Sequence, residues 1–184
     1  MSRRRYLTEA EVELLLSVAR LDKNGVRNHC LILMAFRHGY RISELLSLKL
    51  SDIDLNSRQI YVRRLKNGFS TVHPLRGNEY QAVSEWLSIR ESYVAAASSD
   101  HVFLSERGTS LSRKQAWYII KTCGLKAGIS INSHPHMLRH ACGYTLANTG
   151  VDTRLIQDYL GHKNIRHTVH YTKSNSERFA SLWD

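Results

Sequence analysis

The most constraining feature of the sequence is an unbroken apolar run at residues 30–36, Cys-Leu-Ile-Leu-Met-Ala-Phe. The run lies inside a segment of helical character over residues 26–38, which ends at Gly39. A helix that is apolar on nearly all sides is buried on all sides, so we expect this segment at the centre of the fold. Seven apolar residues fall well short of the roughly 18 that a membrane span requires, so the run predicts no transmembrane helix.

Helix start signals and apolar periodicity recur on both sides of this segment. Thr8 and Glu11 form a capping box, and Leu7 and Val12 are spaced as a hydrophobic staple, so a helix should begin at about residue 9. Further helices are expected at about 41–48, 78–92, 112–126, 135–149 and 152–161.

The pattern changes period between residues 59 and 75. Two runs rich in β-branched and aromatic residues, 59–65 and 70–75, flank the tripeptide Lys66-Asn67-Gly68. Asn-Gly between such runs is a strong hairpin signal, because both central residues of a type I′ turn have positive φ. The sequence therefore predicts a mostly α, α+β fold with one small antiparallel β-sheet, and it places Lys66 at a hairpin tip.

Length and charge limit the class of protein. The 184 residues contain no linker or repeat and predict a single domain over residues 1–184. The 26 Lys and Arg residues outnumber the 16 Asp and Glu residues, giving a net charge of +10 that indicates either a solubilising surface or a footprint for a polyanion. The basic start lacks the apolar stretch of an export signal, so we expect a cytoplasmic protein. The three scattered cysteines, Cys30, Cys123 and Cys142, are expected to be reduced and buried.

Residues 133–140 contain a possible anion site. His136 and Arg139 lie three positions apart near a helix N-terminus, where backbone N–H groups and the helix dipole favour an anion. The alternative is that both are surface residues paired with carboxylates. His136 and His140 are also four positions apart, but the intervening residues lack the glutamate of a zinc-protease motif and include a cation, so we expect no metal site.

The candidate residues form a spaced series along the chain. The series reads Arg41-x-x-Glu44, Lys66, His136-x-x-Arg139, Leu160-Gly161-His162, and Tyr171 nine residues after His162. In this order the motifs resemble the catalytic domain of the tyrosine recombinase (phage integrase) family, over about residues 7–171. Within that family, residues 69–74, 134–140 and 152–162 resemble the short bacterial recombinases that invert a fimbrial promoter element.

The resemblance implies a role for each motif residue. Tyr171 would attack the scissile phosphodiester, giving a 3′-phosphotyrosyl link and a free 5′-hydroxyl without ATP, metal or cofactor. Arg41 and Arg139 would bind the non-bridging oxygens of the phosphate and stabilise the charge of the transition state. Glu44 would orient Arg41, or would form an ordinary surface pair with it.

The remaining implied roles concern proton transfer and hydrogen bonding. Lys66 would protonate the leaving 5′ oxygen, the alternative being a solvated turn lysine. His136 would assist proton transfer at the tyrosine and the phosphate, and His162 would donate a hydrogen bond to the phosphate. Packing, capping or backbone contacts are expected for the other histidines considered, which are His38, His73, His134, His140, His167 and His170.

Both chain ends carry separate expectations. Larger members of the family have an N-terminal domain that clamps DNA, and we expect no such domain before this catalytic fold, so that the chain is either an excised fragment or a short family member. Residues 1–6 would form a basic arm on DNA phosphate or a solubilising tail. Residues 174–184 would form a short helical tail that covers this chain's own core or a neighbouring subunit.

The resemblance also implies partners. We expect double-stranded DNA with inverted-repeat sites, a homotetramer on that DNA, accessory DNA-bending proteins, and a cytoplasmic, nucleoid-associated location. Inversion of a promoter element that controls fimbrial phase variation is the expected function. Two alternatives remain open, a catalytically inactive DNA-binding regulator of the same fold and a type IB topoisomerase.

Overall fold

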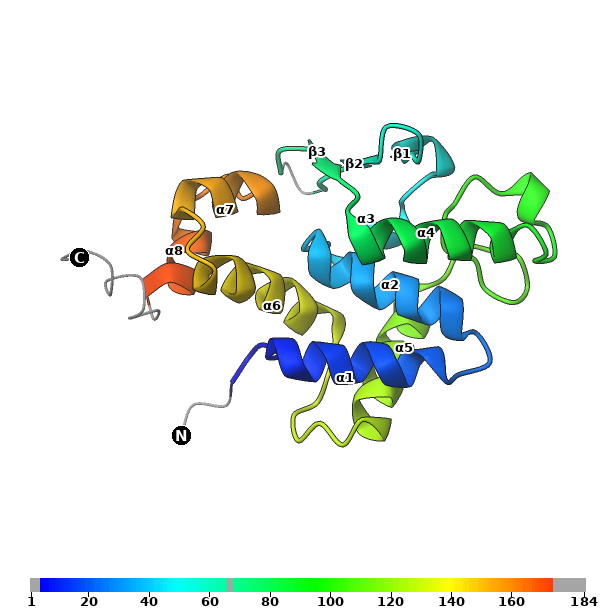
Figure 1. Cartoon of the computed structure of the whole chain (residues 1–184), viewed down its shortest axis with the longest axis horizontal. Coiled ribbons are helices and arrows are strands. Elements are labelled where there is room, and N and C mark those ends of the chain that lie inside the picture. Colours follow the sequence, from blue (N-terminus) through cyan, green and yellow to red (C-terminus); the bar gives the residue numbers. More distant parts are fainter. Residues whose placement is uncertain (1–3, 66–67, 174–184) are drawn as a thin grey trace.

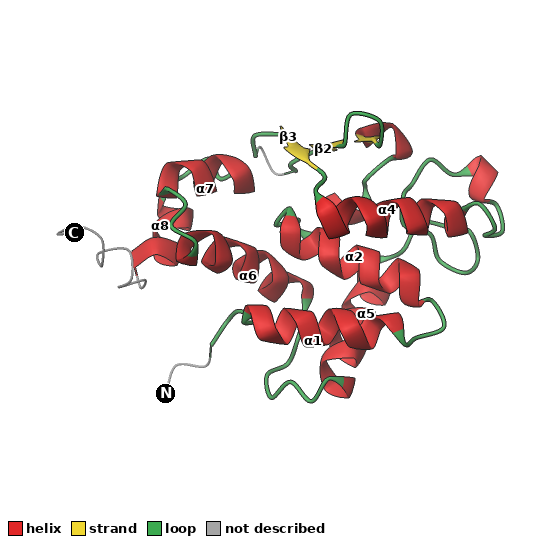
Figure 2. Ribbon diagram, in the orientation of Figure 1, coloured by secondary structure: helices red, strands yellow, loops and turns green. Residues whose placement is uncertain are grey.

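A computed structural model of the chain describes residues 4–65 and 68–173. The helices are α1 (Glu9–Arg20), α2 (Gly25–Arg37), α3 (Ile42–Leu46), α4 (Gly77–Arg90), α5 (Arg113–Lys126), α6 (Pro135–Asn148), α7 (Thr153–Leu160) and α8 (Arg166–Lys173). The strands are β1 (Ile53–Asp54), β2 (Gln59–Val62) and β3 (Thr71–Pro74), and two 3₁₀ turns occur at η1 (Leu50–Asp52) and η2 (Ala96–Ser98). The strands lie at one edge of a mainly helical molecule (Figures 1 and 2).

The helix α2 is the centre of the fold, as its sequence predicts. Each side chain of residues 30–34 is at most 1% exposed, and α1, α4 and α6 all contact α2. Figure 1 shows α2 between α1 and α4, with α6 leading from it toward α7 and α8. Within the described residues, no helix is both long and apolar enough to span a membrane.

The expected cap at the first helix is confirmed. The Thr8 side chain accepts from the Glu11 backbone N–H at 3.2 Å, and the Glu11 carboxylate accepts from the Thr8 N–H at 2.8 Å. Leu7 and Val12 are both buried beneath this turn.

The expectation that the three cysteines are reduced and buried is also confirmed, because all three are buried and free.

The sheet is antiparallel with strand order β1-β2-β3, and its first strand was not predicted. Pairing of β2 with β3 runs from Gln59↔Pro74 to Val62↔Thr71, so the ladder is shorter than the runs 59–65 and 70–75 predict. The expected strand ends are therefore wrong. Beyond Val62, Arg64 turns its side chain into the helical core instead of continuing the ladder. Lys66 and Asn67 lie outside the described residues.

Part of the expected N-terminal arm packs against the body of the protein. Arg4 forms an ion pair with Glu11 at 2.5 Å, and the Tyr6 ring stacks on Tyr144 of α6 with centroids 3.9 Å apart. Residues 1–3 and the expected helical tail at 174–184 lie outside the described residues.

Candidate active site

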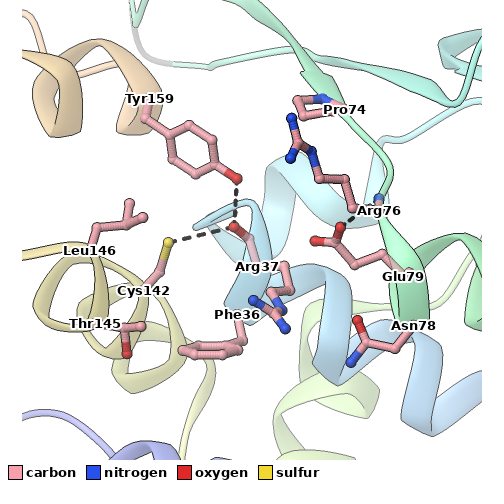
Figure 3. A pocket seen from close by; sticks show the side chains of 11 residues that line it. Phe36, Arg37, Pro74, Arg76, Asn78, Glu79, Cys142, Thr145, Leu146 and Tyr159 are labelled. Atoms are coloured by element: carbon pink, nitrogen blue, oxygen red, sulfur yellow. Dashed lines mark hydrogen bonds between the residues drawn. The ribbon is translucent and has the colours of Figure 1, made fainter. Parts of the chain in front are cut away.

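Three successive carbonyl groups at the end of α2 organise the site, and we call them the carbonyl end of α2 (Arg37, His38 and Gly39). Carbonyls at a helix C-terminus have no partner within the helix and must be satisfied from outside. The first, that of Arg37, accepts from the Tyr159 hydroxyl of α7 at 2.7 Å and from the Cys142 thiol of α6 at 3.7 Å. Figure 3 shows both side chains pointing at this oxygen. Both also line a cavity of about 340 Å³. The carbonyl end of α2 thus fixes α6 and α7 in place.

Two buried arginines bind the other two carbonyls. Arg64 donates to the His38 carbonyl at 2.7 Å and to the Gly39 carbonyl at 3.1 Å. Arg139 of α6 also donates to the Gly39 carbonyl, and it donates to the Leu160 carbonyl of α7 at 2.9 Å. Cations are favoured at the negative end of a helix dipole, so these arginines are stabilised where they lie.

The first helical turn of α3 holds the remaining motif arginine. Arg41 is the N-cap residue, and both its backbone N–H and its Nη1 donate to the carboxylate of Glu44, at 3.0 and 2.7 Å. The Arg41 side chain stays 30% exposed, whereas that of Glu44 is fully buried. This excludes the ordinary surface pair that the sequence left open, because Glu44 lies in the interior.

Glu44 is the shared counterion of three arginines. Its carboxylate also accepts from Arg64 at 3.1 Å and lies 3.9 Å from Arg139. Burial acts to raise the pKa of Glu44, but the hydrogen bonds from Arg41 and the nearby arginine charges outweigh it, so the pKa is lowered. Burial lowers the pKa of Arg139 to about 10. One carboxylate balances only one of three cations, which leaves the site strongly positive and suited to an anion.

The candidate nucleophile, Tyr171, lies against α6. Its side chain is 2% exposed, and a Cβ added at Gly143 would lie 2.6 Å from its ring, so only glycine leaves room for it there. Burial raises the pKa of Tyr171 well above its usual value, although nearby Arg139 acts in the opposite direction. In this arrangement the phenol is protonated and shielded from solvent.

The hydrogen-bond partner of Tyr171 is His140 and not His136. The Tyr171 hydroxyl lies 3.0 Å from Nδ1 of His140. His136 is exposed at the start of α6, and its ring meets His140 edge to face at 4.3 Å. Burial, the neighbouring His136 and the other nearby cationic groups lower the pKa of His140 to about 4, so the ring is neutral near pH 7. Sequence reasoning gave His140 only a packing role.

His162 also lies near the ring of Tyr171. It follows Gly161 at the end of α7, and its Nδ1 lies 2.8 Å from the hydroxyl of Thr168. The rings of His162 and Tyr171 are nearly parallel, with centroids 6.5 Å apart. Burial and the charges of the two motif arginines lower the pKa of His162 to about 3.

The structure therefore brings five of the predicted residues into one site beside the carbonyl end of α2, namely Arg41, Glu44, Arg139, His162 and Tyr171. Lys66 lies outside the described residues, but its neighbour Leu65 donates its backbone N–H to Glu44 at 3.2 Å. Sequence reasoning missed Arg64, although the alternation of buried residues along β2, Ile60 and Val62, already directs position 64 inward.

Metal ligands do not gather here within the described residues. No group of three or more His, Cys, Asp or Glu side chains that could hold a metal ion occurs in the described part of the chain. The expectation of a reaction without metal or cofactor stays a prediction.

Comparison with known proteins identifies the family. Residues 5–178 match the model of the phage integrase family. The chain belongs to the phage integrase family. This confirms the resemblance seen in the motif series.

The similarity to known proteins covers nearly the whole chain. The type 1 fimbriae regulatory protein FimE of Escherichia coli strain K12 is 58% identical over 184 residues, which are 100% of this chain and 93% of FimE. A crystal structure of XerA recombinase matches with a TM-score of 0.83 and 30% identity, over 97% of this chain and 63% of XerA. A crystal structure of the XerH site-specific recombinase bound to its difH substrate, in a pre-cleavage complex, matches with a TM-score of 0.77 and 26% identity. The match covers 98% of this chain and 53% of the XerH chain. The catalytic-domain fold of this phage integrase family member and the expectation of a recombinase enzyme are confirmed.

Proposed function

We propose that this chain is a site-specific DNA recombinase that inverts a promoter element and thereby controls fimbrial phase variation. The observation that carries the chemistry is the position of Tyr171 close enough to Arg139 and Arg41 for both charges to act on its phenol, while Arg139 itself binds the carbonyl end of α2. The fimbrial role is supported by the 58% identity with a type 1 fimbriae regulatory protein over the full chain.

The arginine clamp (Arg41 and Arg139) binds the scissile phosphate in this proposal. An arginine has five N–H donors, and the two hydrogen bonds from Arg139 to Gly39 and Leu160 leave others for an anion. Arg41 is held by Glu44 with part of its side chain exposed. Planar donor groups fixed in advance stabilise the extra negative charge of the transition state without reorganisation.

Tyr171 is the nucleophile. Its oxygen attacks phosphorus, the bond from phosphorus to the 5′ oxygen breaks, and a 3′-phosphotyrosyl link forms. The phenolic proton passes to His140, 3.0 Å away, and Lys66 supplies a proton to the leaving 5′ oxygen. His162 donates a hydrogen bond to the phosphate. Because Tyr171 is 2% exposed, its ring reaches DNA only after α8 shifts.

Rejoining reverses these steps. The 5′-hydroxyl of another strand attacks the phosphotyrosyl phosphorus and gives its proton back to the Lys66 amine, while the phenolic oxygen leaves and receives its proton from His140. The phosphodiester energy is conserved in the protein link, so no ATP, metal or cofactor takes part.

The DNA partner follows from charge and chemistry. A net charge of +10 suits a polyanion, and inversion requires two inverted-repeat sites brought together, which we assign to a homotetramer. Accessory DNA-bending proteins and a cytoplasmic, nucleoid-associated location belong to the same proposal.

His136, exposed at the start of α6, is assigned to the phosphate rather than to the tyrosine.

The decisive experiment uses a nicked suicide substrate that traps the covalent intermediate. Wild-type protein should become attached to DNA, whereas Tyr171→Phe should bind the DNA and form no covalent complex, because only the phenolic oxygen is lost. The matched control is Tyr80→Phe on α4, outside the site, which should attach normally. Attachment by Tyr171→Phe would contradict the assignment of the nucleophile.

Two outcomes would favour the alternatives. Site-specific binding by wild-type protein without any covalent complex would indicate an inactive DNA-binding regulator. Covalent attachment followed only by relaxation of supercoils, with no inversion between inverted sites, would indicate an enzyme like type IB topoisomerase.

A further inference from the structure

We infer that Arg64 is a positioning residue that holds the chain up to Leu65, directly before the proposed acid Lys66, against the groups that bind the arginine clamp. The inference rests on the proposed function, in which Lys66 is the general acid. Arg64 is not a member of the motif series, and it lies two positions before Lys66. The Arg64 side chain is fully buried and its Nη1 and Nη2 donate to four protein acceptors, so no Nη donor is left for a substrate.

The guanidinium of Arg64 joins three separate parts of the site. Its Nη1 donates to the Gly39 carbonyl and to the Glu44 carboxylate, both at 3.1 Å. Its Nη2 donates to the His38 carbonyl at 2.7 Å and to the Tyr159 carbonyl at 2.8 Å. The segment before Lys66 is thus attached at once to the end of α2, to α3 and to α7.

The backbone around Arg64 is fixed as well. Its N–H donates to the hydroxyl of Ser70 at 3.0 Å, across the base of the hairpin loop. The next residue, Leu65, donates its N–H to Glu44 at 3.2 Å. The backbone N–H groups of the last two described residues before Lys66 therefore both have defined partners, so the chain is held in place up to Leu65.

Close packing prevents sideways movement of the Arg64 stem. A Cβ added at Gly161 would lie 2.7 Å from Cγ of Arg64, and one added at Gly68 would lie 2.8 Å from its Cβ. Both distances are shorter than side chains tolerate, so these glycines bring the loop and the end of α7 against the arginine. Gly161 directly precedes His162, so Arg64 also borders that motif.

Arg64 and the two arginines of the clamp bind the same two groups, the Gly39 carbonyl and the Glu44 carboxylate. The Gly39 carbonyl accepts from both Arg64 and Arg139, and Glu44 binds both Arg64 and Arg41. The residues directly before the proposed proton donor and the arginines of the clamp are therefore held by the same groups. Only the planar fork of arginine reaches four acceptors on two sides, whereas a lysine ammonium is a point donor.

The test compares two versions of the suicide substrate in single-turnover cleavage. One has oxygen and the other has sulfur at the bridging 5′ position, because a thiolate leaves without needing a proton. Arg64→Lys keeps the charge and loses the geometry, and it should slow cleavage of the oxygen substrate by about 10–10³-fold, since a displacement of about 1 Å can cost 10²-fold. On the sulfur substrate its rate should return to within about threefold of wild type, with DNA affinity unchanged.

The matched control is Arg90→Lys. Arg90 is also a buried arginine whose guanidinium donates to backbone carbonyls, those of Ser99, His101 and Ala96. Its replacement should lower thermal stability without a defect specific to the oxygen substrate. Ser70→Ala is a milder change that removes the partner of the Arg64 N–H. It should give a smaller loss that sulfur also reverses, and it serves as the test if Arg64→Lys does not fold.

Each result separates the inference from the function on which it rests. Folded Arg64→Lys protein that cleaves the oxygen substrate at the wild-type rate, or a loss that sulfur does not reverse, would overturn the inference. If instead Lys66→Ala itself is not rescued by sulfur, the assignment of Lys66 as the acid fails.

Discussion

The hydroxyl of Tyr171 lies 3.0 Å from Nδ1 of His140, which projects from α6 one residue after Arg139. The partner of the nucleophile and one arginine of the clamp, Arg139, are thus neighbouring residues of one helix. With a pKa lowered to about 4, the His140 ring is neutral near pH 7, so its Nδ1 can accept the hydrogen bond of the Tyr171 hydroxyl.

The first prediction concerns this pair. His140→Ala should slow covalent attachment to the suicide substrate by about 10²–10⁴-fold, the range for loss of a general base, while DNA binding is retained. Single-turnover cleavage and a binding titration measure the two effects. His136→Ala, four residues away on the same helix, is the comparison and should leave the nucleophile's hydrogen bond intact. An unchanged cleavage rate in His140→Ala would show that the hydrogen bond has no part in catalysis.

The second prediction concerns Gly39, whose φ is +57°. An added Cβ would collide with Cδ2 of Leu160 and lie 3.3 Å from the Cys142 sulfur. Gly39→Ala should therefore cost about 1–3 kcal/mol from backbone strain and about 1–3 kcal/mol more from overpacking, measured by urea unfolding. Gly128→Ala, at φ +68° with open space around it, should show only the strain. Equal losses in both variants would contradict the tight approach of α7 to Gly39.

The third prediction concerns pH. The pKa values of His140 and His162 are lowered to about 4 and 3, below the value of 6.5 expected in the unfolded chain. Between about pH 6.5 and 3 the unfolded chain binds protons that the folded protein does not, so stability decreases as the pH falls. Melting temperatures measured from pH 7.5 to 4 should decline, and less steeply in His162→Asn. Lys163→Gln, at its exposed neighbour, should retain the wild-type slope. A flat profile would exclude buried neutral histidines.

The fourth prediction concerns metals. Covalent attachment to the suicide substrate should proceed in excess EDTA, because the described residues contain no group of three potential ligands and the arginine clamp already supplies positive charge. A magnesium-dependent nuclease in the same buffer confirms that the chelator is effective. Loss of attachment in EDTA with recovery on adding magnesium would require a metal in the mechanism.

Much of this arrangement could be predicted from the sequence. Caps, apolar periodicity and the run at 30–36 located the helices and the central position of α2, because these signals are local. The motif series indicated which residues converge, although only folding brings Arg41 and Tyr171, 130 positions apart, to one site.

The sequence could not give the contacts that depend on packing between elements. His136 and His140 lie on one face of α6, and only the position of α8 decides which ring meets Tyr171. The two residues of β1 are too few to show a period of two. Arg64 was passed over because a charged residue beyond a strand is usually solvated, and the acceptors that compensate its burial come from residues far away in sequence.

The carbonyl end of α2 has a consequence for how this site tolerates mutation. Its acceptors are backbone oxygens, so no substitution can delete them, and only a change of local conformation at Gly39 can redirect them. The donors, by contrast, are ordinary side chains on α6, α7 and the segment after β2. Single substitutions should therefore affect the donors one at a time. Each such variant loses one hydrogen bond to the helix end and keeps the others. Graded, partially active variants are therefore expected when a donor without a proposed catalytic role, Cys142 or Tyr159, is replaced, whereas changes at Gly39 or at Arg139 of the clamp should abolish function at once.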